Sequence, residues 1–240
     1  MQNIQLKAVK LPFAVLNVQS PSGGNTGNVT VKISGSLFTE GMTALLQKGG
    51  TTIPASQVYF TNSTLAYATF NLKGRSLGVY DVLLKKGDTA TTVLERGFSI
   101  VPTNNGGLIT GSGPNTGSGN GSEPGCDPGA PSGLNSQLVV EMVVPPRVLL
   151  GRPVVILLNY SNPTNVDVAA QTRVLYSEAG LKMAFAQPDV PNGQTALYLE
   201  LTEPGGPPGI IRAGGSGTIT IYTQAPKAMP ADPKVYFKLK

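Results

Sequence analysis

The sequence predicts an all-β protein with two β-sandwich domains, joined by a flexible linker rich in Gly, Ser and Asn. Three observations predict it. Glycine (30) and proline (20) punctuate the chain often, as many turns between short strands require. Charged residues make up only 13% of the chain, while the 40% apolar content is enough to form a core. Between the turn signals, apolar and polar residues alternate with the period of two that half-buried strands show.

The linker divides the chain. Residues 103–133 consist almost entirely of Gly, Ser, Asn, Thr and Pro, and only Leu108 and Ile109 offer apolar surface. Such a segment cannot recover its ordering entropy by burial, so we expect a flexible tether that lets its neighbours reorient. The predicted domains are therefore residues 1–102 and 134–240, each of ordinary size for a β-sandwich.

In the first domain, about seven short strands are expected. Their inward faces are predicted to be Val29, Val31 and Ile33; Ala66, Ala68, Phe70 and Leu72; Tyr80, Val82 and Leu84; and Phe98 with Ile100. Gly35 is expected to permit a sharp exit from its strand, and Phe38 to plug the end of the sandwich.

The second domain repeats the pattern. Its inward faces are predicted to be Val154, Ile156, Leu158 and Tyr160; Leu197, Leu199 and Leu201; Ile219 and Ile221; and Val235, Phe237 and Leu239. The segment Ser177–Ala186 has apolar spacing that fits a short helix, which would not alter the fold class.

Missing residue types exclude most catalytic chemistry. With no histidine and one cysteine, Cys126, the chain has no Ser-His-Asp or Cys-His triad, no zinc site of the usual kind and no internal disulfide. Cys126 is interpreted as an exposed thiol, with an intermolecular bridge as the alternative. The sequence therefore predicts no enzyme and no cofactor, and it assigns no catalytic, cofactor-binding or metal-binding residue.

The partners are constrained by charge and hydropathy. The net charge of +5 is spread thinly, with Lys85-Lys86 as the only adjacent cations, so no nucleic-acid partner is expected. No apolar run approaches ~18 residues, so no membrane insertion is expected.

Two sets of acidic residues are candidates for a site. Asp81 and Glu141 lie mid-strand, where a glycosidase pair would be possible, but solvent-facing carboxylates are the simpler interpretation. A calcium site near Asp88 or Asp167, completed by backbone carbonyls, is the alternative to ordinary turn carboxylates there.

Four tyrosines bear on carbohydrate binding: Tyr59, Tyr67, Tyr198 and Tyr222. Each can present its ring outward from a strand, as a sugar-stacking platform needs, but tryptophan is absent and the tyrosines are scattered. Edge packing is the simpler interpretation, and the ligand-binding residues remain unknown.

The first domain resembles the IPT/TIG family over about residues 12–101. The resemblance rests on VQSPSGG at 18–24, VTVKISGSLF at 29–38, Gly41, GVYDV at 78–82 and GFSI at 97–100. It implies an immunoglobulin-like fold of the kind found in bacterial surface proteins and in accessory domains of larger enzymes. The cysteines frequent in the family are missing here.

The second domain more loosely resembles immunoglobulin-like repeats of bacterial cell-surface and adhesin proteins. The matching segments are VPP at 144–146, GRP at 151–153, LLNYSN at 157–162 and NVDV at 165–168. Together the resemblances imply a non-catalytic spacer, stalk or adhesive surface of a large secreted or cell-surface bacterial protein, of which this chain would be an excised piece. The expected partners are other domains of that protein, and a surface protein or glycan. The alternative is a carbohydrate-binding accessory module of a polysaccharide-active enzyme.

Overall fold

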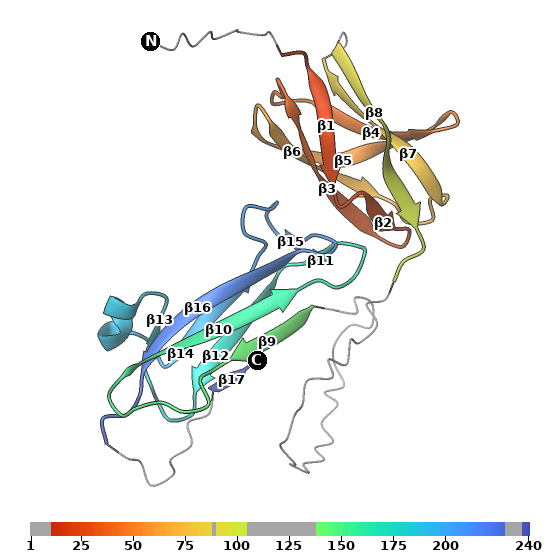
Figure 1. Ribbon diagram of the computed structural model, residues 1–240. Helices are drawn as coiled ribbons and strands as arrows, with labels where there is room; N and C mark the ends of the chain where they lie inside the picture. Colours follow the sequence, from red (N-terminus) through yellow and green to blue (C-terminus); the bar gives the residue numbers. More distant parts are fainter. Residues whose placement is uncertain (1–10, 88–89, 105–137, 229–236) are drawn as a thin grey trace, which may run out of the picture.

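The computed structural model describes residues 11–87, 90–104, 138–228 and 237–240. Within them the chain is mostly β-strand, with one short 3-10 helix, so the all-β prediction is confirmed (Figure 1). Two separate hydrophobic clusters form. One is built almost wholly from residues 11–104, here called the N-terminal unit, and the other from residues 138–240, here called the C-terminal unit. Most of the predicted linker, residues 105–133, lies outside the described residues.

Eight strands form the N-terminal unit. They are β1 (Ala14–Gln19), β2 (Ser22–Gly24), β3 (Asn28–Ser36), β4 (Thr43–Lys48), β5 (Thr51–Asn62), β6 (Leu65–Asn71), β7 (Gly78–Lys86) and β8 (Ala90–Val101). They are joined in the order β1-β3-β6-β5-β4-β7-β8-β2. Strand β5 connects two layers, because its first part through Pro54 pairs with β4 and its later part from Ala55 pairs with β6.

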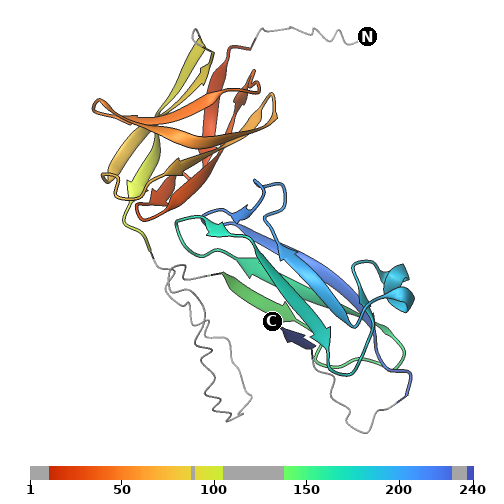
Figure 2. The same ribbon diagram turned by 180° about the vertical axis from the view of Figure 1, so that it is seen from behind.

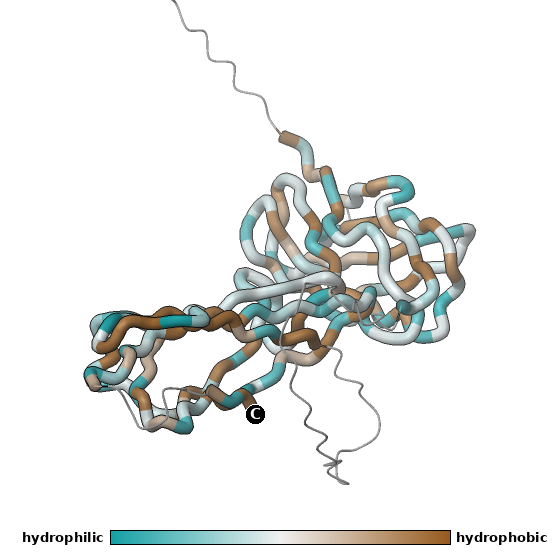
Figure 3. Tube along the Cα trace, turned by 60° about the horizontal axis from the view of Figure 1, so that its bottom comes forward, coloured by the Kyte–Doolittle hydropathy of each residue, from teal (hydrophilic) through white to brown (hydrophobic). Residues whose placement is uncertain are grey.

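The core of the N-terminal unit confirms the predicted alternation. Every inward residue expected for residues 29–33, 66–72, 80–84 and 98–100 is at most 1% exposed. Hydrophobic and hydrophilic stretches alternate along the tube in Figure 3. Period-two patterning fixes these faces because successive side chains of a strand point to opposite sides of its sheet.

A close backbone approach explains Gly35 better than a turn does. A Cβ atom on Gly35 would lie 2.1 Å from the carbonyl oxygen of Ala14 and 2.5 Å from the ring of Phe38. The left-handed residue of this stretch is Leu37, with φ of 57°. The expected role of Phe38 fits, since it is 2% exposed and meets the Phe13 ring edge-on with centroids 6.3 Å apart.

The C-terminal unit has shorter sheets. Its strands are β9 (Val139–Val143), β10 (Pro153–Ser161), β11 (Val168–Ala169), β12 (Gln171–Ser177), β13 (Met183–Ala184), β14 (Ala196–Leu201), β15 (Ile210–Ile211), β16 (Ser216–Gln224) and β17 (Phe237–Leu239). They form the sheets β13-β16-β10-β9, β14-β12-β17 and β11-β15. The predicted inward residues of β10 and β14, and Ile221, are buried, whereas Ile219, Phe237 and Leu239 are half-buried; Val235 lies outside the described residues.

The prediction of a short helix over Ser177–Ala186 is wrong. Ser177 ends β12, and Met183 and Ala184 pair with Thr223 and Tyr222 of β16 as strand β13. The helical element comes next, as the 3-10 helix η1 (Gln187–Asn192), which has Pro near its start. Backbone pairing with β16 therefore outweighed the weak helical spacing. Among the described residues, no helix has the length and apolar character that crossing a membrane requires.

Candidate functional site

The most elaborate arrangement of polar side chains lies where the two units meet. One end of the N-terminal unit, with residues 24–30, 67–69 and 102–104, faces residues 162–167 and 203–213 of the C-terminal unit. Figures 1 and 2 show the ends of β2 and β3 next to β11 and β15 from opposite sides. We call this contact the junction.

Asp167 is at the centre of the junction. Its Oδ1 accepts hydrogen bonds from the Thr30 N–H (3.1 Å) and the Ala213 N–H (3.3 Å), and its Oδ2 accepts one from the Thr30 hydroxyl (2.6 Å). Its own N–H donates to the Asn28 carbonyl at 2.8 Å. One carboxylate thus links β3 of the N-terminal unit to the C-terminal unit, across 137 residues of sequence.

The surroundings of Asp167 perturb its ionisation. Burial raises the pKa of its carboxyl from 3.8 to about 6, against the opposing effects of the hydrogen bonds from Thr30 and Ala213 and of the Arg212 charge. Desolvation dominates here because removal from water disfavours the charged form of a carboxyl group.

A second set of hydrogen bonds is made by Asn165. Its carbonyl accepts from the Gly24 N–H (2.7 Å), and its side chain accepts from the Asn104 N–H (3.0 Å) and donates to the Pro102 carbonyl (3.0 Å). The Asn104 side chain in turn accepts from the Asn165 N–H at 2.8 Å. Asn104, at the start of the predicted linker, therefore takes part in the junction.

Tyr67 and Arg212 form the third part. The Tyr67 hydroxyl donates to the Gly205 carbonyl at 2.7 Å, and the Arg212 guanidinium lies over the Tyr67 ring, 5.0 Å from its centroid. Glu203 holds Arg212 through both carboxylate oxygens, with the closest contact at 2.5 Å. The Arg212 Nη1 atom is buried without a hydrogen-bond partner in the described part of the chain.

The 162–167 loop is held rigid by Asn162, which is 1% exposed. Its Nδ2 donates to the carbonyls of Val166, Ile211 and Arg212, and its Oδ1 accepts from both donors of Thr164. The loop consequently presents Val166 to the core of the N-terminal unit and Asp167 to Thr30. A preorganised loop loses little conformational entropy on contact, which favours a defined junction.

The structure does not bring the predicted carboxylates together. Asp81, on β7, accepts a hydrogen bond from the Arg96 N–H at 2.7 Å, while Glu141 is exposed on β9 of the other unit. Asp88 lies outside the described residues. At Asp167, N–H and O–H donors occupy both oxygens where a calcium site would need further oxygen ligands, so the alternative of a calcium site there is not supported. Among the described residues, no three acidic, Cys or His side chains gather as metal ligands would.

The tyrosines differ in exposure. Tyr67 is 4% exposed, so the alternative of an outward sugar-stacking ring does not hold for it; the C-terminal unit covers the ring. Tyr59 and Tyr222 are half-buried. Tyr198, on the edge strand β14, is 75% exposed and stands opposite Val174 of β12.

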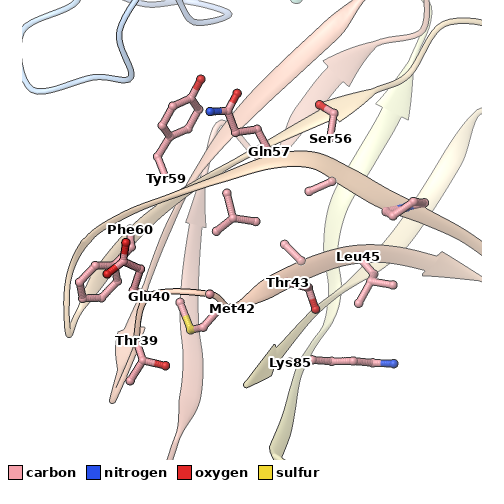
Figure 4. Close-up of a pocket in the computed structure, with 15 residues that line it drawn as sticks. Thr39, Glu40, Met42, Thr43, Leu45, Ser56, Gln57, Tyr59, Phe60 and Lys85 are labelled. Carbon is pink, nitrogen blue, oxygen red and sulfur yellow. The ribbon is translucent and has the colours of Figure 1, made fainter. Parts of the chain in front are cut away.

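An open groove of about 770 Å³ lies where β5 leaves β4. Figure 4 shows Glu40, Met42 and Thr43 on one side and Ser56, Gln57 and Tyr59 on the other, with Lys85 at the rim. Among the described residues that line it, Glu40 is the only carboxylate, whereas glycosidases usually place a pair of acids in their cleft.

Sequence reasoning missed Thr30, Asn162, Asn165 and Arg212. The signals were a Thr flanked by two core valines (Val29, Val31) and the polar run Asn-Pro-Thr-Asn-Val-Asp at 162–167 within an apolar strand region. Neither pattern indicates which residues these side chains contact, because the contacting residues lie far away in the sequence.

No family model matches the chain, and no curated protein sequence matches it. Solved structures that resemble it weakly include the following three. A Corynebacterium diphtheriae protein described as membrane-anchored has 8% identity and a TM-score of 0.29 over 95% of this chain and 54% of that one. The chitinase ChiA74 of Bacillus thuringiensis has 12% identity and a TM-score of 0.24 over 99% of this chain and 30% of that one. Red sea bream transglutaminase has 13% identity and a TM-score of 0.23 over 92% of this chain and 28% of that one. The chain spans about half or less of each of these proteins. Similarity at these TM-scores carries no argument for fold family or function.

Proposed function

We propose that this chain is a non-catalytic structural module, in which two immunoglobulin-like sandwiches form a spacer or stalk within a larger secreted or cell-surface bacterial protein. The observation that carries the proposal is the junction. Directional hydrogen bonds from Asp167 and Asn165, with the Tyr67–Arg212 stack, hold one unit against the other. The separation of Asp81 from Glu141 supports a role without catalysis.

The junction changes the expected mechanical behaviour, because the linker alone predicts two domains that reorient freely. Two freely reorienting blocks would transmit no orientation, whereas docked units present their outer surfaces at a fixed angle. A spacer of this kind sets both the distance and the direction of whatever it displays. Its partners would be other domains of the parent protein and a surface protein or glycan.

An exposed apolar loop is available for such contacts. Val148, Leu149 and Leu150 are 47%, 74% and 48% exposed in the connection between β9 and β10. The loop is anchored by hydrogen bonds from the Gly151 N–H to the Pro226 carbonyl and from the Gln224 side chain to the Gly151 carbonyl. Exposed apolar clusters of this kind commonly mark protein contacts.

The test measures the distance between the units. Spin labels at Gln47→Cys and Glu200→Cys, both exposed strand positions, in a Cys126→Ser background report one distance by double electron–electron resonance. A single narrow distribution is expected at pH 6, because the junction fixes the two units. A broad distribution matching two tethered independent bodies would contradict the proposal.

Carbohydrate binding is the second candidate, and the exposure of Tyr198 favours it. Tyr176 lies diagonally across from Tyr198 on β12, with the Lys240 ammonium 5.5 Å from its ring centroid, so two rings and a cation share this region of the sheet. Rings on an open sheet can stack on sugars.

Polysaccharide pull-down and glycan-array binding would test this candidate. If Tyr198 supplies the platform, Tyr198→Ala should reduce retention at least tenfold, while Tyr59→Ala, on the other unit, should leave it unchanged. Equal retention of both variants, or none by the wild-type chain, would exclude this platform.

A further inference from the structure

We propose that the junction is a proton-coupled latch, in which protonation of Asp167 docks the two units more tightly in mildly acidic than in neutral solution. The inference rests on the proposed function, since it concerns the same docked contact. It adds a regulatory property to the spacer: solution acidity would set how firmly the two units hold their relative orientation.

The first argument is the position of the carboxylate. Asp167 belongs to the C-terminal unit, but two of its three hydrogen-bond donors, the N–H and the hydroxyl of Thr30, belong to the N-terminal unit. Separation of the units would remove both donors and return the carboxylate to water. Docking and the environment of this one ionisable group are therefore coupled.

The second argument is charge balance. Two charged groups of the C-terminal unit lie beside Asp167: Arg212, which acts on Asp167, and Glu203, which holds Arg212 with both oxygens. From the N-terminal unit, Thr30 and the Asn28 carbonyl contact Asp167, and Tyr67 lies beneath Arg212. Strand β3 also carries one cation, the half-buried Lys32, on the face of Thr30 and opposite Tyr67. Because Arg212 is already paired with Glu203, its charge offsets the desolvation of Asp167 only in part, and protonating Asp167 removes the remaining cost.

The third argument is that the hydrogen-bond network accommodates the proton. The Thr30 hydroxyl lies 2.6 Å from Asp167 Oδ2 and 2.7 Å from the Thr69 hydroxyl, and either threonine can donate to the other. With Asp167 ionised, Thr30 donates to it and accepts from Thr69. With Asp167 protonated, its hydroxyl donates to Thr30, which donates to Thr69. Because a hydroxyl both donates and accepts, the docked geometry persists in both states.

The direction of the effect follows from linkage. Burial raises the pKa of Asp167 to about 6 in the docked state, and an exposed carboxyl in the undocked state would keep its ordinary value of 3.8. Between these values the docked state binds more protons, so docking strengthens as the pH falls through 6 and weakens as it rises. From pH 7.5 to pH 5.0 the docking equilibrium should improve about tenfold.

Hydrogen exchange on the full chain tests the latch. The Thr30 N–H donates to Asp167, and the Gly24 N–H donates to Asn165, so both become exchangeable when the junction opens. After correction for intrinsic exchange rates, their protection factors should be about tenfold higher at pH 5.0 than at pH 7.5. Amides inside a unit, such as those of β7, should show no matching change.

Asp167→Asn is the control variant. An amide keeps one acceptor oxygen and donates to the Thr30 hydroxyl, as the protonated carboxyl does, so protection should be high and independent of pH. A wild-type chain without the pH response, or an Asp167→Asn chain that retains it, would overturn the latch. The spin-label distance separates the two proposals: a narrow distribution with no pH response contradicts only the latch, and a broad one at both pH values contradicts the docked spacer itself.

Discussion

Gly35→Ala is expected to lower the free energy of unfolding of the N-terminal unit by about 3 kcal/mol, the upper range for overpacking a core. The new methyl group would lie 2.1 Å from the Ala14 carbonyl oxygen, where strands β1 and β3 pair, and 2.5 Å from the Phe38 ring. A backbone atom cannot rotate away as a side chain can, so β1 would have to move. Urea denaturation followed by tyrosine fluorescence measures the loss.

Gly27→Ala is the matched control for this change. A Cβ atom there would lie 3.5 Å from Val166, an ordinary van der Waals contact, and Gly27 does not have a positive φ. Its expected effect on stability is below ~0.5 kcal/mol, as for ordinary surface substitutions. A Gly35→Ala chain as stable as this control would show that β1 and β3 are not packed as described.

Gly24→Ala is expected to open the junction while leaving both units folded. Its Cβ atom would lie 2.4 Å from Thr103 Oγ1 and 2.5 Å from Asn165 Oδ1. Both oxygens already accept hydrogen bonds, from Thr26 and Asn104 respectively, so moving either side chain breaks its bond. The Thr26 bonds lie within the N-terminal unit, whereas a displaced Asn165 side chain loses two bonds across the junction, from the Asn104 N–H and to the Pro102 carbonyl. Their loss weakens docking by about 2 kcal/mol, roughly 30-fold.

The spin-label pair described above measures this opening. The distance distribution of Gly24→Ala should broaden markedly, whereas Gly27→Ala should keep the narrow wild-type distribution. Circular dichroism and the denaturation midpoint should be close to wild type in both variants, which separates undocking from unfolding. A narrow, unshifted distribution in Gly24→Ala would show that Asn165 does not anchor the junction.

The two glycines of this contact illustrate how specific it is. Gly24 ends strand β2 and Gly27 lies three residues later, yet of the two only Gly24 faces a polar cluster that leaves no room for a methyl group. Sequence offers no basis for ranking them, because the crowding comes from Thr103 and Asn165, which both lie far away in the sequence.

The sequence by itself determined the strand faces and the two cores. The side-chain period of a strand is a local property, so the alternation from Val29 to Ile33 or from Val154 to Tyr160 placed these residues inside without knowledge of any partner strand. Composition equally determined that no imidazole chemistry and no disulfide within the chain are available. Local spacing failed at Ser177–Ala186, where pairing with a strand nearly forty residues away decided the structure.

Only the tertiary structure decided the junction. The sequence predicts an ordinary turn carboxylate at Asp167 and edge packing at Tyr67, and it does not predict that contact between the units covers the ring of Tyr67 and removes Asp167 largely from water. The pairing of Thr30 with Asp167 joins residues 137 positions apart on separately folded units. Nothing in the local pattern of either segment encodes that contact, because it depends on how two finished surfaces fit together.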